Sequence, residues 1–383
     1  MMLLKFSKSY AHQFLLLLLW SIVQGLLWFI IGPKIGADSD LYFTLAEELH
    51  RLEFPLNRTL LYSSYSLFIL VSQTLFSGKF SVLFFHLLFN GLSILAFYSI
   101  IANTSENKKT ALIGSIIYCL YLPLHEWNFI VYGESIFTSF TIFCIYFIVT
   151  KKYKLLLITL LITVFCRPTS LLFLLALFIG WAYQKYKNGN YSQRVTLFLM
   201  GIISLTLGIL FHQALEYYGP FMIEGYLIPE IIYFRNSLGV SPPINPYIPS
   251  EDDDIIIQLF LFVLNNWWYF LKITLIKGAL FFGNIKPYYS LPHNLLIILL
   301  LYPLYYFAFR KCLKKDRLKF IDIFCITYIL LQGFTVSITS ENWDGRFIIP
   351  IIPFIIYLSC FEIYNTLKKN RALITFVRYF TLH

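Results

Sequence analysis

The sequence is poor in charged residues, which make up only 13% of its 383 positions. Soluble proteins carry about 25% charged residues, so this composition does not suit a surface that faces water on all sides. The chain also lacks any polar stretch long enough to form a separate soluble domain. These absences exclude a soluble globular protein and predict a single integral membrane domain over residues 1–383.

Cysteine is scarce as well. Its six residues occur singly and without CxxC spacing, which argues against a zinc centre or a disulfide framework. No small-residue cleavage site follows the apolar run after Lys5 and Lys8, so we expect a retained first span and no signal peptide. The net charge of +10 lies mainly in short loops between apolar runs, a distribution that indicates membrane topology and not a nucleic-acid partner.

Apolar runs are what the chain has in abundance, since it is 58% hydrophobic and 19% aromatic. About 20 apolar residues cross a bilayer as a helix, and shorter runs also recur here. We predict an all-α polytopic fold with about ten spans, within a range of 9–12, at residues 11–31, 80–101, 110–124, 134–150, 153–166, 168–184, 195–215, 293–309, 321–339 and 347–365.

Two further apolar segments, 60–77 and 256–283, are interrupted by polar or basic residues. If neither crosses the membrane, 20 of the 30 lysines and arginines fall on one side with only 4 of the 20 acids. Basic residues concentrate on the cytoplasmic side, which favours this topology with both termini cytoplasmic. We therefore expect both segments to be interfacial or re-entrant helices. The first loop, 32–79, and a larger segment, 216–292, then lie outside.

The first outer loop holds two aspartates and two glutamates within the 14 residues of Gly36–Leu49. Leucines recur at helical spacing after Asp38, which makes Asp38 or Ser39 a natural N-cap of a short helix along the membrane. One interpretation is that these aspartates only cap and solvate that helix. The other is that Asp38 is a general base at the water–lipid boundary, where partial desolvation brings a carboxylate pKa closer to neutral pH.

Charged residues also occur at the predicted outer ends of later spans. Glu134 opens the span 134–150, where a carboxylate favourably meets a helix N-terminus. Arg167 lies at the turn between two short spans, and either an ion pair or a lipid phosphate would account for its charge. Arg58 and Arg346 compete for that phosphate, because a guanidinium can hold one through two donors.

In their order along the chain, these features resemble the GT-C class of polyprenol-phosphate-sugar-dependent glycosyltransferases, especially the protein O-mannosyltransferase and lipid A aminoarabinose transferase group. The resemblance covers most of residues 1–365. Many relatives have adjacent Asp-Glu in the first loop, whereas this chain has Asp38-Ser39-Asp40, and Asp38 matches the catalytic carboxylate by position. The other matching motifs are Gly133-Glu134-Ser135, Cys166-Arg167-Pro168-Thr169 and Gly345-Arg346-Phe347-Ile348-Ile349-Pro350.

The resemblance implies a GT-C-like enzyme that moves a sugar from a polyprenyl-phosphate donor to a glycan, lipid or protein acceptor on the outer face of a membrane. Asp38 is the expected base, Asp40 and Glu134 are expected helpers, and Arg58, Arg167 and Arg346 are expected contacts of the donor phosphate. No cofactor is expected. A metal site at Asp38-Ser39-Asp40 is less favoured, because residues i and i+2 of a helix point in different directions.

Three alternatives to this enzyme handle related lipid-linked sugars: an O-antigen-type polymerase, a transporter and a flippase. Transporters place ionisable residues near the bilayer midplane, whereas the acids here cluster in the predicted outer loops. The composition and the absence of targeting signals fit a bacterial inner membrane. The sugar, the acceptor and the prenol length stay open.

Overall fold

The part of the chain that the computed structural model describes is mostly helical. That part comprises residues 2–53, 58–75, 78–188, 243–286, 288–314, 318–339 and 343–369, together with 201, 205, 208, 209, 211–213, 215, 216, 219, 220, 222–224 and 226. Within these residues the isolated backbone bridge between Lys34 and Ile130 is the sole β-type pairing. The all-α prediction is therefore confirmed for the described residues.

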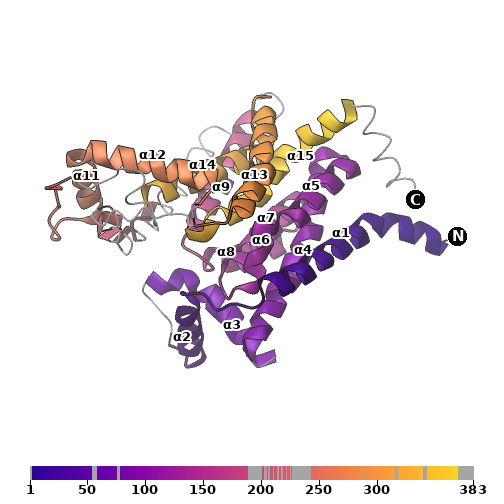
Figure 1. Ribbon diagram of the computed structural model, residues 1–383, viewed down its shortest axis with the longest axis horizontal. Helices are drawn as coiled ribbons and strands as arrows, with labels where there is room; N and C mark the ends of the chain where they lie inside the picture. The colour runs from indigo at the N-terminus through magenta and orange to yellow at the C-terminus, as the bar shows by residue number, and fades with distance from the viewer. Residues whose placement is uncertain are drawn as a thin grey trace. The chain divides into compact units, whose positions relative to one another are not determined.

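Helices coincide with nine of the ten predicted spans (Figure 1): α1 (Met2–Ile30), α4 (Lys79–Ser105), α5 (Lys108–Leu120), α7 (Glu134–Val149), α8 (Tyr153–Val164), α9 (Ser170–Asn188), α13 (Leu291–Cys312), α14 (Phe320–Ile338) and α15 (Ile352–Lys369). The tenth predicted span, 195–215, lies mostly outside the described residues. The remaining elements are α2 (Ser39–His50), η1 (Arg58–Tyr62), α3 (Ser63–Leu75), α6 (Leu122–His125), η2 (Glu126–Phe129), α11 (Ile255–Asn265), α12 (Trp267–Gly283), η4 (Trp343–Gly345) and η5 (Ile349–Ile351).

Five helical segments of the described chain are long and apolar enough to cross a bilayer: Tyr10–Ile30, Phe80–Ser105, Leu291–Cys312, Phe320–Ile338 and Ile349–Lys369. The chain is therefore an integral membrane protein. Helices α7 and α8 are apolar but have only 16 and 12 residues, which is shorter than the ~20 residues that span the hydrocarbon core. The count of ten spans stays a prediction.

The segment 256–283 is not one straight helix. Helices α11 and α12 meet at a break with an angle of 97° between them, as in a broken span or a re-entrant loop. Asn266 lies at the break, and its side chain accepts the Tyr247 N–H (3.1 Å) and donates to the Tyr247 carbonyl (2.9 Å). These bonds hold the corner, and the expected interfacial or re-entrant placement of this segment stays a prediction.

The chain divides into two compact units, each made of several sequence segments. Unit 1 comprises Met1–Arg167, Ile298–Cys325 and Ile349–His383, and unit 2 comprises Pro168–Ile297 and Ile326–Ile348. The single membrane domain expected from the sequence stays a prediction.

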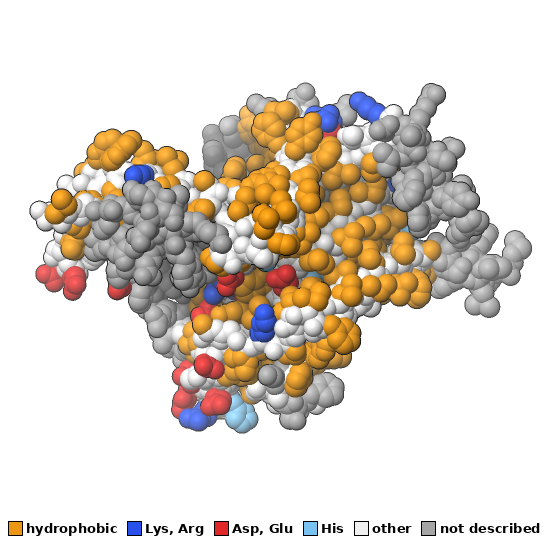
Figure 2. All heavy atoms as spheres, in the orientation of Figure 1, with side chains coloured by type: hydrophobic (Ala, Val, Ile, Leu, Met, Phe, Trp, Pro, Cys, Tyr) orange, Lys and Arg blue, Asp and Glu red, His pale blue; other side chains and the backbone are white. Residues whose placement is uncertain are grey.

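Close helix packing in unit 1 depends on small residues. A Cβ atom at Gly114 of α5 would lie 2.6 Å from Ile101 Cδ1 of α4 and 3.2 Å from Cys360 Cβ of α15. Glycine at such positions lets helix backbones approach closely, as is common in membranes. In Figure 2, acidic and basic side chains gather over α2 at one end of this unit, while the side chains over α1 and α4 are mostly hydrophobic. The polar end is therefore where a site is to be sought.

Candidate functional site

The loop that carries Asp38 is fixed against the segment that precedes α7. The Lys34 N–H donates to the Phe129 carbonyl (2.8 Å), and the Val131 N–H donates to the Lys34 carbonyl (3.2 Å). Ser39 is fully buried, and its Oγ donates to the Val131 carbonyl (2.9 Å) and accepts the Gly36 N–H (2.8 Å). These long-range bonds give the Asp38 loop a defined conformation between α1 and α2.

Asp38 immediately precedes α2, which confirms the predicted helix start at Asp38 and Ser39, yet its side chain makes no capping hydrogen bond. The side chain is half-buried, and the Asp38 N–H donates to Tyr132 Oη (3.2 Å). Asp40 and Glu47 are exposed, and Glu48 is half-buried. Asp38 is thus held through its backbone N–H by Tyr132, and its side chain does not cap α2.

A cluster of tyrosine rings packs around Tyr42 of α2. Tyr42 is buried, and its ring centroid lies 4.9 Å from that of Tyr65, 5.7 Å from that of Tyr62 and 6.2 Å from that of Tyr132. The hydroxyl of Tyr65 lies 3.2 Å from His86 Nε2 of α4. This cluster packs α2 against α3 and α3 against α4 in unit 1. The helix that begins after Asp38 is therefore held in place by side-chain packing.

Glu134 and Arg167 form a buried ion pair, with 2.8 Å between Oε1 and Nη1 and side-chain exposures of 1% and 4%. Glu134 is the first residue of α7, and Arg167 follows the end of α8. Of the two interpretations of Arg167, the ion pair is the one seen in the structure. Contact with a donor phosphate stays a prediction.

At Gly133 the ion pair lies close to Tyr65 of this tyrosine cluster. A Cβ atom at Gly133 would lie 3.6 Å from Tyr65 Cγ and 3.7 Å from Arg167 Cγ. The segment from Tyr132 to Glu134 therefore contacts Asp38 through Tyr132 and Arg167 through Glu134. Asp38, Glu134 and Arg167 are thus connected to one another through this segment of unit 1.

Arg58 and Arg346 are the other two predicted arginines. Arg58 begins η1, but its side chain lies outside the described residues. Arg346 belongs to unit 2, where it is half-buried with its guanidinium carbon 5.1 Å from the Phe347 ring centroid. That Arg58 and Arg346 converge with Asp38 on one cavity stays a prediction.

Two sets of buried polar side chains in unit 1 were not predicted from the sequence. His125 lies within hydrogen-bonding distance of Asn90 Oδ1 (3.1 Å) and of the Tyr118 carbonyl (2.9 Å). Asn128 donates to Gln24 Oε1 (3.0 Å) and accepts the Ser135 hydroxyl (2.6 Å). The first set of bonds links α4 and α5, and the second links α1 and α7. Polar residues inside apolar runs, such as Gln24 and Asn90, were the sequence signal for them.

Glu126, at the start of η2, is a second half-buried carboxylate near the Asp38 loop. Burial raises the pKa of the Glu126 carboxyl above its ordinary value, and the charge of Lys34 partly offsets that rise. Lys34 pairs with Phe129 and Val131 through its backbone, which brings the two charges to the same part of the fold. In the sequence Glu126 lies between the predicted spans 110–124 and 134–150, and no pattern there indicates a role for it.

We expect Glu126→Gln to be more stable than the wild type at pH 7. Because folding raises the pKa of Glu126, its contribution to stability is present in acid and is lost as the pH rises through the folded-state pKa. Below about pH 4 the carboxyl is protonated in both states, so the difference in unfolding midpoint should vanish. Thermal unfolding in detergent between about pH 3 and 8 measures this, and a difference that does not change with pH would contradict it.

A side chain at Gly36 is expected to displace the Tyr132 ring. A Cβ atom there would lie 2.3 Å from Tyr132 Cε2, and displacing the Tyr132 ring would break its bond to the Asp38 N–H. Overpacking of this kind costs about 1–3 kcal/mol, so Gly36→Ala should lower both the unfolding midpoint and any activity that depends on Asp38. Gly25→Ala is the matched control, since nothing lies within 4 Å of the added atom. Equal behaviour of the two variants would show the expectation to be wrong.

The structure describes no group of three or more histidine, cysteine, aspartate or glutamate side chains placed to hold a metal ion within the residues it covers. Asp38 and Asp40 differ in exposure, half-buried against exposed. That the protein requires no cofactor stays a prediction.

Comparison with known proteins identifies a fold and no family. No protein-family model matches the chain. No curated protein matches it either. Its fold is similar to that of the Archaeoglobus fulgidus oligosaccharyltransferase, solved with a disulfide-tethered acceptor peptide containing the NVT sequon, with a TM-score of 0.51 at 13% sequence identity. The similarity covers 96% of this chain and 51% of that chain, so this chain spans about half the length of the solved structure. The likeness supports the GT-C-like fold expected from the sequence.

Proposed function

We propose that this protein is a membrane glycosyltransferase that moves a sugar from a polyprenyl-phosphate donor to an acceptor, with Asp38 as the general base. The observation that carries the proposal is the similarity of 96% of the chain to the fold of an oligosaccharyltransferase. The half-buried carboxylate of Asp38, in a loop fixed by long-range hydrogen bonds, supports the assignment of the base.

The reaction is a single displacement. The acceptor oxygen or nitrogen attacks the anomeric carbon as its proton passes to Asp38, and the bond between that carbon and the phosphate oxygen breaks. The electron pair of that bond leaves with the polyprenyl phosphate, whose growing negative charge a guanidinium can stabilise. One carboxylate and one cation suffice for these steps, and attack opposite the leaving group inverts the anomeric centre.

The exposure and contacts of each site residue favour one of its proposed roles over the others. Asp40 is exposed in the first turn of α2, where it can assist acceptor binding. Glu134 is held by Arg167 in the buried ion pair, so we assign both residues mainly to fixing the ends of α7 and α8 beside the Asp38 loop. Arg58 and Arg346 are therefore the preferred candidates for the donor phosphate.

The proposal is tested with purified protein in lipid nanodiscs, radiolabelled polyprenyl-phosphate sugars and a panel of glycan, lipid and peptide acceptors. We expect label to pass to an acceptor while polyprenyl phosphate is released in equal amount. A panel in which no donor is cleaved, although the protein is folded, would overturn the proposal.

The broken helix α11–α12 is the feature that favours a transporter, because discontinuous helices line the sites of such proteins. A transporter or flippase would carry the intact lipid-linked sugar across a liposome membrane without cleaving it. Measuring both donor cleavage and donor translocation in the same liposomes therefore separates the two functions. We place the transfer at the non-cytoplasmic face of a bacterial inner membrane, with both termini in the cytoplasm, and cysteine labelling from each side tests this orientation.

A further inference from the structure

Asp38 stands where an aspartate usually caps a helix. An N-cap aspartate normally has an extended backbone, and its side chain accepts the backbone N–H of the second or third helical residue. Asp38 instead has φ −85° and ψ −4°, in the right-handed helical region, and its side chain makes no capping hydrogen bond. The capping role that an aspartate has at this position is therefore not used in the fold.

A tight turn determines the backbone conformation of Asp38. The Ser39 N–H donates to the Gly36 carbonyl (3.1 Å), which closes a turn over Gly36–Ser39. The dihedral angles of Asp38 match those of the third residue of a type I turn, which are about −90° and 0°. Because the first N–H groups of a helix have no partner within it, the Asp38 N–H, which precedes them, needs an acceptor from outside the helix.

Tyr132 supplies that acceptor, because the Asp38 N–H donates to Tyr132 Oη (3.2 Å). The Tyr132 side chain is only 9% exposed. Its ring centroid lies 5.7 Å from that of Trp127 and 6.2 Å from that of Tyr42. The absence of a side chain at Gly36 leaves room for the edge of the ring. Packing therefore fixes the position of the phenol oxygen, and the hydrogen bond transmits that position to the backbone of Asp38.

We propose that Tyr132 is a positioning residue that acts through Asp38: its hydroxyl holds Asp38 in the turn conformation and so keeps the carboxylate from capping α2, which leaves it available to the acceptor. The inference rests on the proposed function, because it concerns Asp38 as the base. Capping requires the extended backbone that this turn excludes. Without the hydroxyl, the Asp38 N–H loses its acceptor, the backbone rotates to the extended region, and the carboxylate accepts N–H groups of the first turn of α2.

Tyr132→Phe tests the effect on the reaction, because it removes the hydroxyl and keeps the packed ring. We expect kcat for sugar transfer to fall about tenfold, since displacing a base acts on the chemical step, and KM for donor and acceptor to stay unchanged. In the Asp38→Asn background the same substitution should lower kcat no further, because a positioning residue acts only through Asp38. A further loss in that background, or a raised KM for the acceptor, would assign Tyr132 to substrate binding and overturn the proposal.

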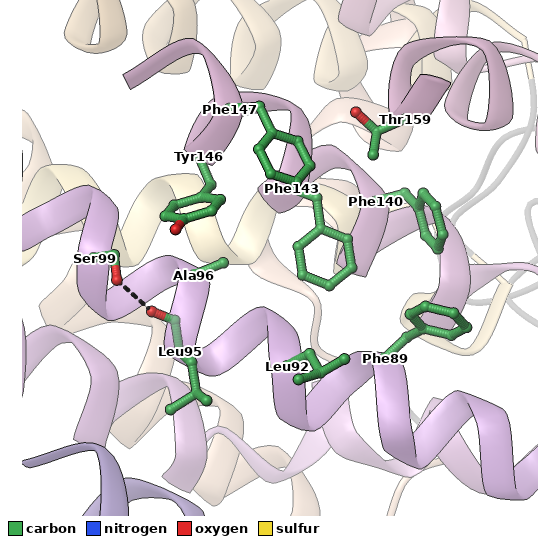
Figure 3. A pocket seen from close by; sticks show the side chains of 10 residues that line it. All are labelled: Phe89, Leu92, Leu95, Ala96, Ser99, Phe140, Phe143, Tyr146, Phe147 and Thr159. Carbon is green, nitrogen blue, oxygen red and sulfur yellow. Dashed lines mark hydrogen bonds between the residues drawn. The ribbon is translucent and has the colours of Figure 1, made fainter. Parts of the chain in front are cut away.

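Two other tyrosines of unit 1 are matched controls for the loss of a hydroxyl. Tyr98 Oη lies 2.9 Å from His12 Nδ1, so Tyr98→Phe also removes a hydrogen bond, here between α4 and α1. Tyr146 lies in the wall of an apolar cavity of about 410 Å³ whose lining residues all come from α4, α7 and α8 (Figure 3). Tyr98→Phe and Tyr146→Phe should each keep the wild-type kcat. A tenfold loss in either control would show that the effect at Tyr132 is not specific and would overturn the assignment.

Thermal unfolding in detergent tests the change of role at Asp38 without any transfer assay. Asp38→Ala should lower the unfolding midpoint by about 2 °C more in the Tyr132→Phe background than in the wild type, because only there does the carboxylate cap α2. Equal losses in the two backgrounds would overturn the proposal. The predicted difference without any donor cleavage would refute the glycosyltransferase and keep Tyr132 as the residue that prevents capping, whereas donor cleavage with equal losses would do the reverse.

Discussion

Replacing Asp38 with asparagine is expected to lower the rate of sugar transfer by about 10²–10⁴-fold while the protein still inserts and folds. Asparagine keeps the size and hydrogen-bonding capacity of the side chain but cannot take a proton from the acceptor. Folding should survive because the Asp38 side chain makes no capping bond, and the Asp38 N–H that contacts Tyr132 is unchanged by the substitution.

The effect of Asp38→Asn is measured as kcat with saturating donor and acceptor, since loss of a base acts on the chemical step. Asp40→Asn is the matched control, because it makes the same change two residues away on an exposed side chain. We expect Asp40→Asn to retain most of the activity. Full activity of Asp38→Asn would remove Asp38 as the base, and equal loss in both variants would indicate a shared electrostatic role.

The positions of the helices could be predicted well because they depend on local composition. Apolar runs of sufficient length become helices in a membrane, where every backbone group must be bonded within its own segment. The break at Asn266 is held by hydrogen bonds to Tyr247, and a hydropathy pattern gives no information about such contacts. From the balance of charged loops, the sequence predicts that 256–283 is an interfacial or re-entrant helix. The position of its break became visible only in the fold.

The candidate site was predicted only in part, for a similar reason. The composition of the first loop pointed to Asp38, but the contacts that fix its position come from Phe129, Val131 and Tyr132, about 90 residues later. Pairing of Glu134 with Arg167 was open in the sequence, because a buried charge shows only that it needs some partner. Glu126 looked like one more loop acid until burial distinguished it.

Breaking the Glu134–Arg167 pair is expected to destabilise the protein by about 3–5 kcal/mol, because either single substitution removes the ion-pair contact of a buried charge. The side chains are 1% and 4% exposed, so water cannot replace the lost interaction. We expect Glu134→Gln and Arg167→Met each to lower the thermal unfolding midpoint strongly and to reduce the yield of folded protein.

The double variant Glu134→Gln with Arg167→Met decides what the pair does. Removing both charges removes the desolvation cost together with the attraction, so this variant should be more stable than either single one. If the pair only positions α7 and α8, the double variant should keep most of the transfer activity and the wild-type KM for the donor. If Arg167 also contacts the donor phosphate, stability returns but KM for the donor rises, because the guanidinium that held the phosphate is gone. Additive destabilisation of the two single variants would show that the charges do not interact and would contradict the ion pair itself.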